Sequence, residues 1–214
     1  MPKQAPTRLE HMFASSAPDA QKKHQTSKQR ELTCEKSPYG NAVGSVVLGI
    51  DPGLTRCGYA VLEVQGLTQI TMRALGVLRT RPDQPLPQRL AELSVEIDQL
   101  LDEYLPSVVA VEHIFFQSNV RTAMSVGQVS GLALSAAARR GLQVAQYTPN
   151  QVKLALTGWG AADKAQVQKM VKQRLGLNTI PKPADAADAA AIALCHIASS
   201  PLEQKINSAK AKSA

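Results

Sequence analysis

Two acidic residues follow directly on apolar runs of the sequence. Asp51 ends the run Val46–Ile50, and Glu112 ends the run Val108–Val111. Short apolar runs that are bounded by turn residues are typical of buried strands. A carboxylate at the end of such a strand is costly to desolvate unless a cation compensates it. If the two strands are parallel neighbours, their chains lie about 4.8 Å apart, and the two carboxylates end side by side.

A second pair of acidic residues lies near the C-terminal end of the sequence. Asp185 and Asp188 stand at the start of the alanine-rich stretch 184–198, which is predicted to form a helix. Residues three positions apart share one face of a helix, so both carboxylates are expected to project together from its first turn. Acidic residues are also common in the first turn for electrostatic reasons alone, and this pair by itself does not define a site.

Taken together, the four carboxylates indicate a site for divalent cations. Mg²⁺ and Mn²⁺ prefer oxygen ligands, and Mg²⁺ commonly completes its shell with water and phosphate. Two such ions about 3.5–4 Å apart can activate a water molecule and stabilise the leaving oxygen in phosphodiester cleavage. We therefore predict a metal-binding catalytic cluster made of these four residues: Asp51, Glu112, Asp185 and Asp188.

The spacing of apolar residues predicts the elements that position these acids. Residues 45–51, 58–64 and 69–79 are predicted to be strands joined by short turns, which form an antiparallel meander. The first turn contains Pro52-Gly53, a pair that suits tight turns. The third strand is expected to bend at Gly76.

Helices and strands alternate after the meander. Leucines at three- and four-residue spacing predict a helix over 86–105, and an apolar strand follows at 107–112. The remaining predicted elements are helix 118–140, strand 142–147, and helices 149–157, 163–175 and 184–198. This order favours an α/β fold with a five-stranded mixed sheet flanked by helices. A helical crossover makes the first and fourth strands parallel.

Length and composition favour one domain with two tails. The 214 residues, 44% of them hydrophobic, suffice for one sizeable α/β domain, expected over 44–201. The polar segments 1–43 and 202–214 lack a sustained apolar period, and both are predicted to be disordered basic tails. No apolar run reaches the length of a membrane span and no signal peptide is evident, so a cytoplasmic protein is expected. Its three widely spaced cysteines suit reduced thiols.

The positive charge is concentrated in one part of the predicted domain. The chain carries a net charge of +7, and the segment 139–182 holds eight lysines and arginines against the single acid Asp163. A basic face is typical of a protein that binds a polyanion such as nucleic acid. A solvated helix face explains the same charge equally well, so charge alone does not decide between these interpretations.

Five motifs resemble, in order and spacing, those of the RuvC family of bacterial Holliday junction resolvases. The motifs are Ile50–Gly53, Val111–Phe115, Gln151–Lys153, Asp163–Val167 and Ala184–Ala189. The resemblance covers residues 45–200. It implies an RNase H-like fold, a homodimer, and Mg²⁺-dependent paired nicking of four-way DNA junctions that leaves 5′-phosphate and 3′-hydroxyl ends. It also implies two ions in each active site, with Mn²⁺ as an alternative, and the RuvA–RuvB branch-migration complex as a partner.

The resemblance also assigns roles to residues beyond the acids. Lys153 and Lys164 stand where the family has lysines that contact DNA near the scissile phosphate, and Phe115 stands where the family has an aromatic residue that stacks at the junction. An exposed ring could stack on an unpaired base, whereas a phenylalanine is more often buried. His196 is expected to be packed in the core and to take no part in catalysis.

Two other classes of protein stay open at this point. Residues Gly49–Thr55 resemble the first phosphate loop of actin-like ATPases, although no second phosphate loop and no second lobe are evident. A noncatalytic DNA-binding or RNA-processing relative on the same fold is the other alternative.

Overall fold

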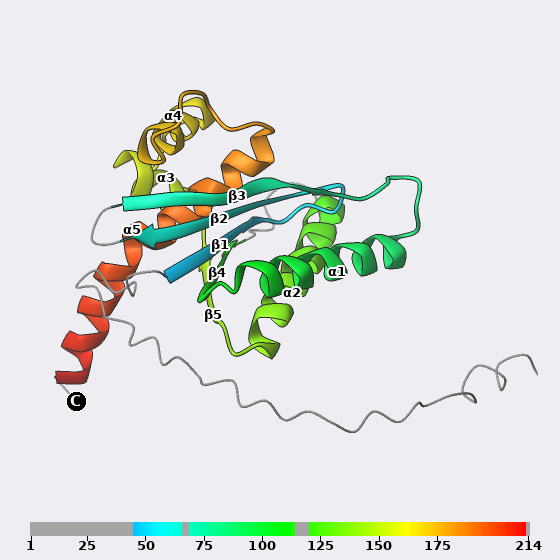
Figure 1. Ribbon diagram of the computed structural model, residues 1–214, viewed down its shortest axis with the longest axis horizontal. Coiled ribbons are helices and arrows are strands. Elements are labelled where there is room, and N and C mark those ends of the chain that lie inside the picture. The colour runs from blue at the N-terminus through cyan, green and yellow to red at the C-terminus, as the bar shows by residue number, and fades with distance from the viewer. Residues whose placement is uncertain (1–44, 66–68, 114–119, 213–214) are drawn as a thin grey trace, which may run out of the picture. The chain divides into compact units, whose positions relative to one another are not determined.

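Five strands form one mixed sheet in the order β3-β2-β1-β4-β5 (Figure 1). The strands are β1 (Ser45–Asp51), β2 (Arg56–Gln65), β3 (Gln69–Arg79), β4 (Val108–Glu112) and β5 (Gln143–Tyr147). The computed structural model describes residues 45–65, 69–113 and 120–212. The predicted five-stranded mixed sheet is therefore confirmed, while the predicted tail 1–43 lies outside the described residues.

The strand pairing brings the two strand-end acids together as predicted. β1 runs antiparallel to β2 and parallel to β4, with Ile50 opposite Val111. Asp51 and Glu112 are the next residues along these two strands. The parallel ladder follows from the helical crossover between β1 and β4, because a hairpin turn can join only antiparallel strands.

β3 contains an irregularity that the sequence did not predict. The ladder between β2 and β3 shifts register between Val61 and Leu62, opposite Arg73. An extra residue in one strand of an antiparallel pair produces such a bulge. Gly76 instead stays paired with Tyr59, and a Cβ there would lie 2.7 Å from the Tyr59 hydroxyl. The glycine leaves room for the tyrosine ring, and the bend of the strand at this residue stays a prediction.

Five helices cover the sheet in two groups. They are α1 (Leu86–Tyr104), α2 (Val120–Arg139), α3 (Pro149–Thr157), α4 (Lys164–Arg174) and α5 (Ala184–Lys212). α1 and α2 lie on one side of the sheet, and α3, α4 and α5 lie on the other (Figure 1). Thr148 and Asp163 each begin a helix with a complete capping box, which satisfies otherwise unpaired backbone amides. None of the described helices combines the length and the apolar character that a membrane crossing requires.

Helix α5 is longer than predicted. It was expected to end at residue 198, and 202–214 was expected to be a disordered tail, whereas the helix runs to Lys212. Residues 202–212 contain three lysines and two alanines together with one leucine, one glutamate and one glutamine, all of which favour helices. The expectation rested on the missing apolar period, which does not prevent a helix from continuing.

Each face of the sheet has its own apolar core. Val46, Leu48 and Ile50 pack toward α1 and α2, whereas Val47 belongs to the core with α3, α4 and α5. Two of the three cysteines, Cys57 and Cys195, are buried in the core.

Candidate active site

The alternation of side chains along the central strands decides which way the acids point. In β1, Val47 packs on the α5 side of the sheet, and Asp51 lies four residues further along the same face. In β4, Ala110 packs on that side, so Glu112 two residues later shares its face. Both strand-end carboxylates are therefore directed toward the helices α3, α4 and α5.

Two glycines allow α5 to lie directly against the centre of the sheet. A Cβ on Gly49 of β1 would lie 2.3 Å from the backbone oxygen of Ala189, and a Cβ on Gly58 of β2 would lie 2.1 Å from that of Asp185. Any larger residue at either position would push the helix away. Since Gly58 pairs with Asp51 in the β1–β2 ladder, this close approach brings the first turn of α5 over Asp51.

The carboxylates of this cluster are not all easily ionised at the same time. Burial is the main reason that the pKa of Asp51 rises to about 7, and the three neighbouring carboxylates raise it further. Burial and the charge of Asp188 likewise raise the pKa of Glu112, while Lys164 opposes that rise. Like charges in a partly desolvated site repel one another, so such a cluster calls for compensating positive charge.

Two cations of the chain itself supply part of that charge. The Arg56 guanidinium donates from Nε to Asp185 Oδ2 over 2.7 Å, and its Nη2 lies 2.5 Å from the same oxygen. The Lys164 ammonium donates to Asp188 Oδ2 over 2.5 Å, and this ion pair raises the pKa of Lys164. Within the described part of the chain, no group of three or more histidine, cysteine or acidic side chains has the arrangement of a metal site. The metal role of the four acids therefore stays a prediction.

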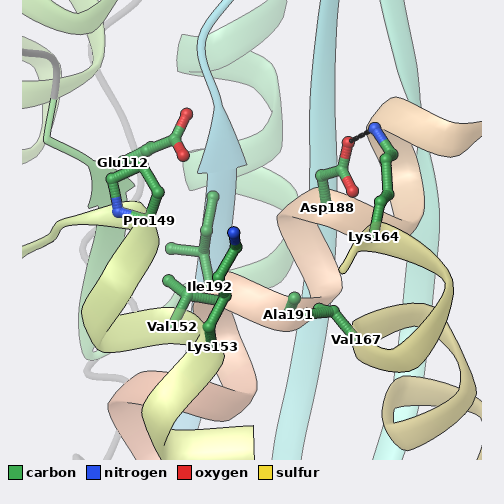
Figure 2. A pocket seen from close by; sticks show the side chains of 9 residues that line it. All are labelled: Glu112, Pro149, Val152, Lys153, Lys164, Val167, Asp188, Ala191 and Ile192. Atoms are coloured by element: carbon green, nitrogen blue, oxygen red, sulfur yellow. Dashed lines mark hydrogen bonds and ion pairs between the residues drawn. The ribbon is translucent and has the colours of Figure 1, made fainter. Parts of the chain in front are cut away.

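A pocket of about 240 Å³ opens beside the acids. Figure 2 shows that its charged side chains come from β4, α3, α4 and α5, with Lys153 between Glu112 on the left and the Asp188–Lys164 pair on the right. These side chains are Glu112, Lys153, Lys164 and Asp188. Both lysines singled out in the sequence thus lie at the site, whereas Phe115 lies outside the described residues.

Arg56 is a charged residue at the site that the sequence did not single out. Its side chain reaches Asp185 only because β2 places it beside the start of α5, and nothing local in the sequence signals that contact. His196, by contrast, is buried and hydrogen-bonded through Nδ1 to the Tyr147 hydroxyl at 2.8 Å, in agreement with the prediction that it is packed in the core.

A buried arginine anchors the turn that follows Asp51. Arg89 of α1 donates from Nη2 to the Thr55 hydroxyl over 2.7 Å and from Nε to the Thr80 hydroxyl over 2.8 Å. Thr80 in turn donates its hydroxyl hydrogen to the Leu54 carbonyl over 2.6 Å. The network joins the turn after β1 to the end of β3 and to α1, so it restricts movement of the backbone next to the first acid.

We expect Arg89→Met to loosen this turn. The substitution keeps much of the side-chain volume but removes two hydrogen bonds from a charged donor, and it should lower the free energy of unfolding by about 2–4 kcal/mol. Amide exchange at residues 53–56 should speed up at the same time. Arg81→Met is the matched control, because Arg81 is exposed and pairs with Asp83 on the same loop. Equal urea midpoints for the two variants would contradict the anchoring role.

The carboxylate cluster also predicts a pH-dependent stability in a chelating buffer. The folded-state pKa of Asp51, about 7, lies above its ordinary value of 3.8. Its contribution to the unfolding free energy is therefore fully present below pH 3.8 and is lost as the pH rises through about 7. Asp51→Asn should be more stable than the wild type at pH 8 by on the order of 3 kcal/mol, and this gap should close toward pH 4. Urea unfolding from pH 4 to 8 measures it.

Comparing the stability of the wild type with that of Asp51→Asn separates the effect of Asp51 from that of His196, whose pH dependence has the opposite sign. Burial lowers the pKa of His196 from 6.5 to about 4, so its contribution to stability is lost as the pH falls through that range. His196 is present in both proteins, and its effect cancels in their difference. Asp83→Asn serves as a control, since Asp83 is exposed and Arg81 lowers its pKa. A difference in stability between the wild type and Asp51→Asn that stays constant with pH would count against the cluster.

Comparison with known proteins agrees with this geometry. Residues 47–196 match the family model described as "Crossover junction endodeoxyribonuclease RuvC". A relative of that name from Streptomyces avermitilis is 53% identical over 165 residues, which cover 77% of this chain and 94% of the relative. The actin-like ATPase alternative is thereby set aside.

Solved structures lead to the same family. The Thermus thermophilus RuvC in complex with a Holliday junction substrate is 38% identical, with a TM-score of 0.71 over 74% of this chain and 96% of that protein. The yeast mitochondrial Holliday junction resolvase Ydc2, at 16% identity and a TM-score of 0.58 over 78% of this chain and 84% of that one, shares the fold. This is the RNase H-like fold that was predicted. The chain belongs to the RuvC family of crossover junction endodeoxyribonucleases.

Proposed function

We propose that the chain resolves Holliday junctions by hydrolysing one phosphodiester bond in each of two symmetric DNA strands, leaving 5′-phosphate and 3′-hydroxyl ends. The observation that carries this proposal is the convergence of four carboxylates from β1, β4 and α5 on one edge of the sheet, beside a pocket with two lysines. Membership in the RuvC family supports it. The four-way junction bound to the Thermus thermophilus relative supports the choice of substrate.

The donor set of the cluster fits Mg²⁺, with Mn²⁺ as an alternative. All four acids offer only oxygen ligands, which hard divalent cations prefer. A cation beside Asp51 and Glu112 would relieve the repulsion and desolvation that raise the pKa of both groups. We therefore propose that two ions are held by the four acids: Asp51, Glu112, Asp185 and Asp188. When bound, they would supply Lewis-acid stabilisation and an activated water.

The chain's own groups then position the DNA for that chemistry. Asp51 stands at the end of a buried central strand, which fixes its carboxylate within the site. Lys153 and Lys164 enter the pocket from two different helices, and either ammonium can hold the scissile phosphate and neutralise charge that develops on it. The ion pair with Asp188 keeps Lys164 protonated and orients it over the site.

Two symmetric cuts require two active sites, and a homodimer supplies them. α2 carries the glycines Gly127 and Gly131, and among the described residues no atom outside the backbone of α2 itself lies within 4 Å of a Cβ built on either one. Such a face allows close approach of another backbone, although small residues serve tight packing within a chain equally well. The RuvA–RuvB complex is proposed as a partner, and only the family resemblance supports this choice of partner.

The proposed function is tested by offering the full chain three substrates. We expect metal-dependent, paired nicking of a synthetic four-way junction, much weaker cleavage of a linear duplex with the same sequence, and no cleavage without Mg²⁺. An RNA–DNA hybrid separates junction resolution from RNA processing. Cleavage of the hybrid without cleavage of the junction, or junction cleavage in a chelating buffer, would overturn the proposal.

A further inference from the structure

An exposed tryptophan lies on the loop between α3 and α4. The side chain of Trp159 is 58% exposed, and that of Leu154 on the exposed side of α3 is 57% exposed. Tryptophan is enriched at interfaces, because its large ring buries much apolar surface while its N–H finds a hydrogen-bond partner. Trp159 is the only tryptophan of the chain.

Hydrogen bonds hold this loop in a defined conformation. The Thr157 hydroxyl donates to the Lys153 carbonyl over 2.7 Å and accepts from the Trp159 amide over 3.1 Å. The Ala162 amide donates to the Trp159 carbonyl over 3.1 Å. Gly158 ends α3 with a positive φ of 75°, which turns the chain toward the loop. The indole is therefore presented from a fixed backbone.

The charge around the loop points to a polyanionic partner. The loop joins the two helices that carry the pocket lysines: Lys153 lies one turn before Thr157, and Lys164 begins α4. α4 adds three further cations, which are Lys169, Lys172 and Arg174, and Asp163 is the one acid between residues 149 and 174. An aromatic ring between basic helices is the combination by which proteins hold unpaired nucleotides, through base stacking and phosphate contacts.

We propose that Trp159 stacks on an unpaired base of the junction DNA next to the strand to be cut. Lys153 and Lys164, which are proposed to hold the scissile phosphate, lie on the two helices that flank this loop. This inference rests on the proposed function, since it takes the bound nucleic acid to be a DNA junction. It adds a contact on the α3–α4 side of the site that is independent of Phe115.

The lone tryptophan makes the contact directly measurable. With the full chain in a chelating buffer, which prevents cleavage, titration with a four-way junction should quench the emission of Trp159. The quenching should saturate together with the anisotropy of a labelled junction. Trp159→Ala should weaken junction binding by about 5- to 100-fold, the range that base–aromatic stacking supplies, whereas Trp159→Phe should retain most of the affinity.

Val95→Ala is the matched control, because Val95 is 56% exposed but lies on α1, on the opposite side of the sheet. It should bind the junction as the wild type does. Unchanged emission at saturating junction together with unchanged affinity of Trp159→Ala would overturn the inference. So would emission that depends on protein concentration without DNA, which would indicate that a second copy of the chain covers the indole. Neither result contradicts the proposed function as long as the wild type cuts junctions. Failure of the proposed function would instead be seen as the absence of junction cleavage by the wild type.

Discussion

Asp51→Asn should abolish junction cleavage while leaving junction binding measurable. The substitution keeps the size of the side chain and removes one negative charge from the centre of the carboxylate cluster. We expect the cleavage rate to fall by at least about 10³-fold, the upper range for losing one essential electrostatic contact in an active site. Single-turnover cleavage of a labelled four-way junction in Mg²⁺ measures the rate, and gel retardation in the same buffer measures binding.

The folded state of the variant is not expected to explain the loss. Removing a partly buried like charge should stabilise the metal-free protein, so the expected variant is more stable and yet inactive, a combination typical of active-site residues. Asp83→Asn, an exposed acid in the loop before α1, should cut at the wild-type rate. Full cleavage by Asp51→Asn would remove the central residue of the proposed site.

The sequence could predict which acids converge because the signals for each were local. Asp51 and Glu112 each end an apolar run, and a helical crossover between two such runs makes their strands parallel. The spacing of Asp185 and Asp188 fixes their shared helix face. Only the pairing of β1 with β4 and the docking of α5 were needed to bring them together, and the structure contains both.

Other features of the site depend on contacts between distant segments. Arg56 and Asp185 are 129 residues apart, and Arg89 and Thr55 are 34 residues apart. No pattern within either segment specifies such a partner, because the contact exists only once the sheet and helices have packed. Gly76 shows the same limit: glycine in a strand indicates either a bend or a close neighbour, and only the folded structure places the ring of Tyr59 against it.

Gly58→Ala should reduce junction cleavage by about 100-fold or more, although residue 58 carries no functional group. The new methyl would lie 2.1 Å from the Asp185 backbone oxygen and 2.6 Å from its carbonyl carbon. Both are backbone atoms, so the first turn of α5 must move as a unit, and it carries Asp185 and Asp188 away from Asp51. A displacement of about 1 Å is enough for a loss of this size. The rate is measured on the four-way junction across a range of Mg²⁺ concentrations.

The Mg²⁺ dependence separates displacement of the acids from simple loss of stability. Overpacking should cost about 1–3 kcal/mol, so the assay is run well below the melting temperature, where circular dichroism shows that the variant is folded. If the acids have moved apart, the half-saturating Mg²⁺ concentration should rise, which unfolding of a fraction of the molecules would not cause. Val95→Ala, an exposed change on α1 across the sheet from α5, should alter neither quantity. An unaltered Mg²⁺ dependence in folded Gly58→Ala would mean that the docking of α5 on β2 does not set the geometry of the acids.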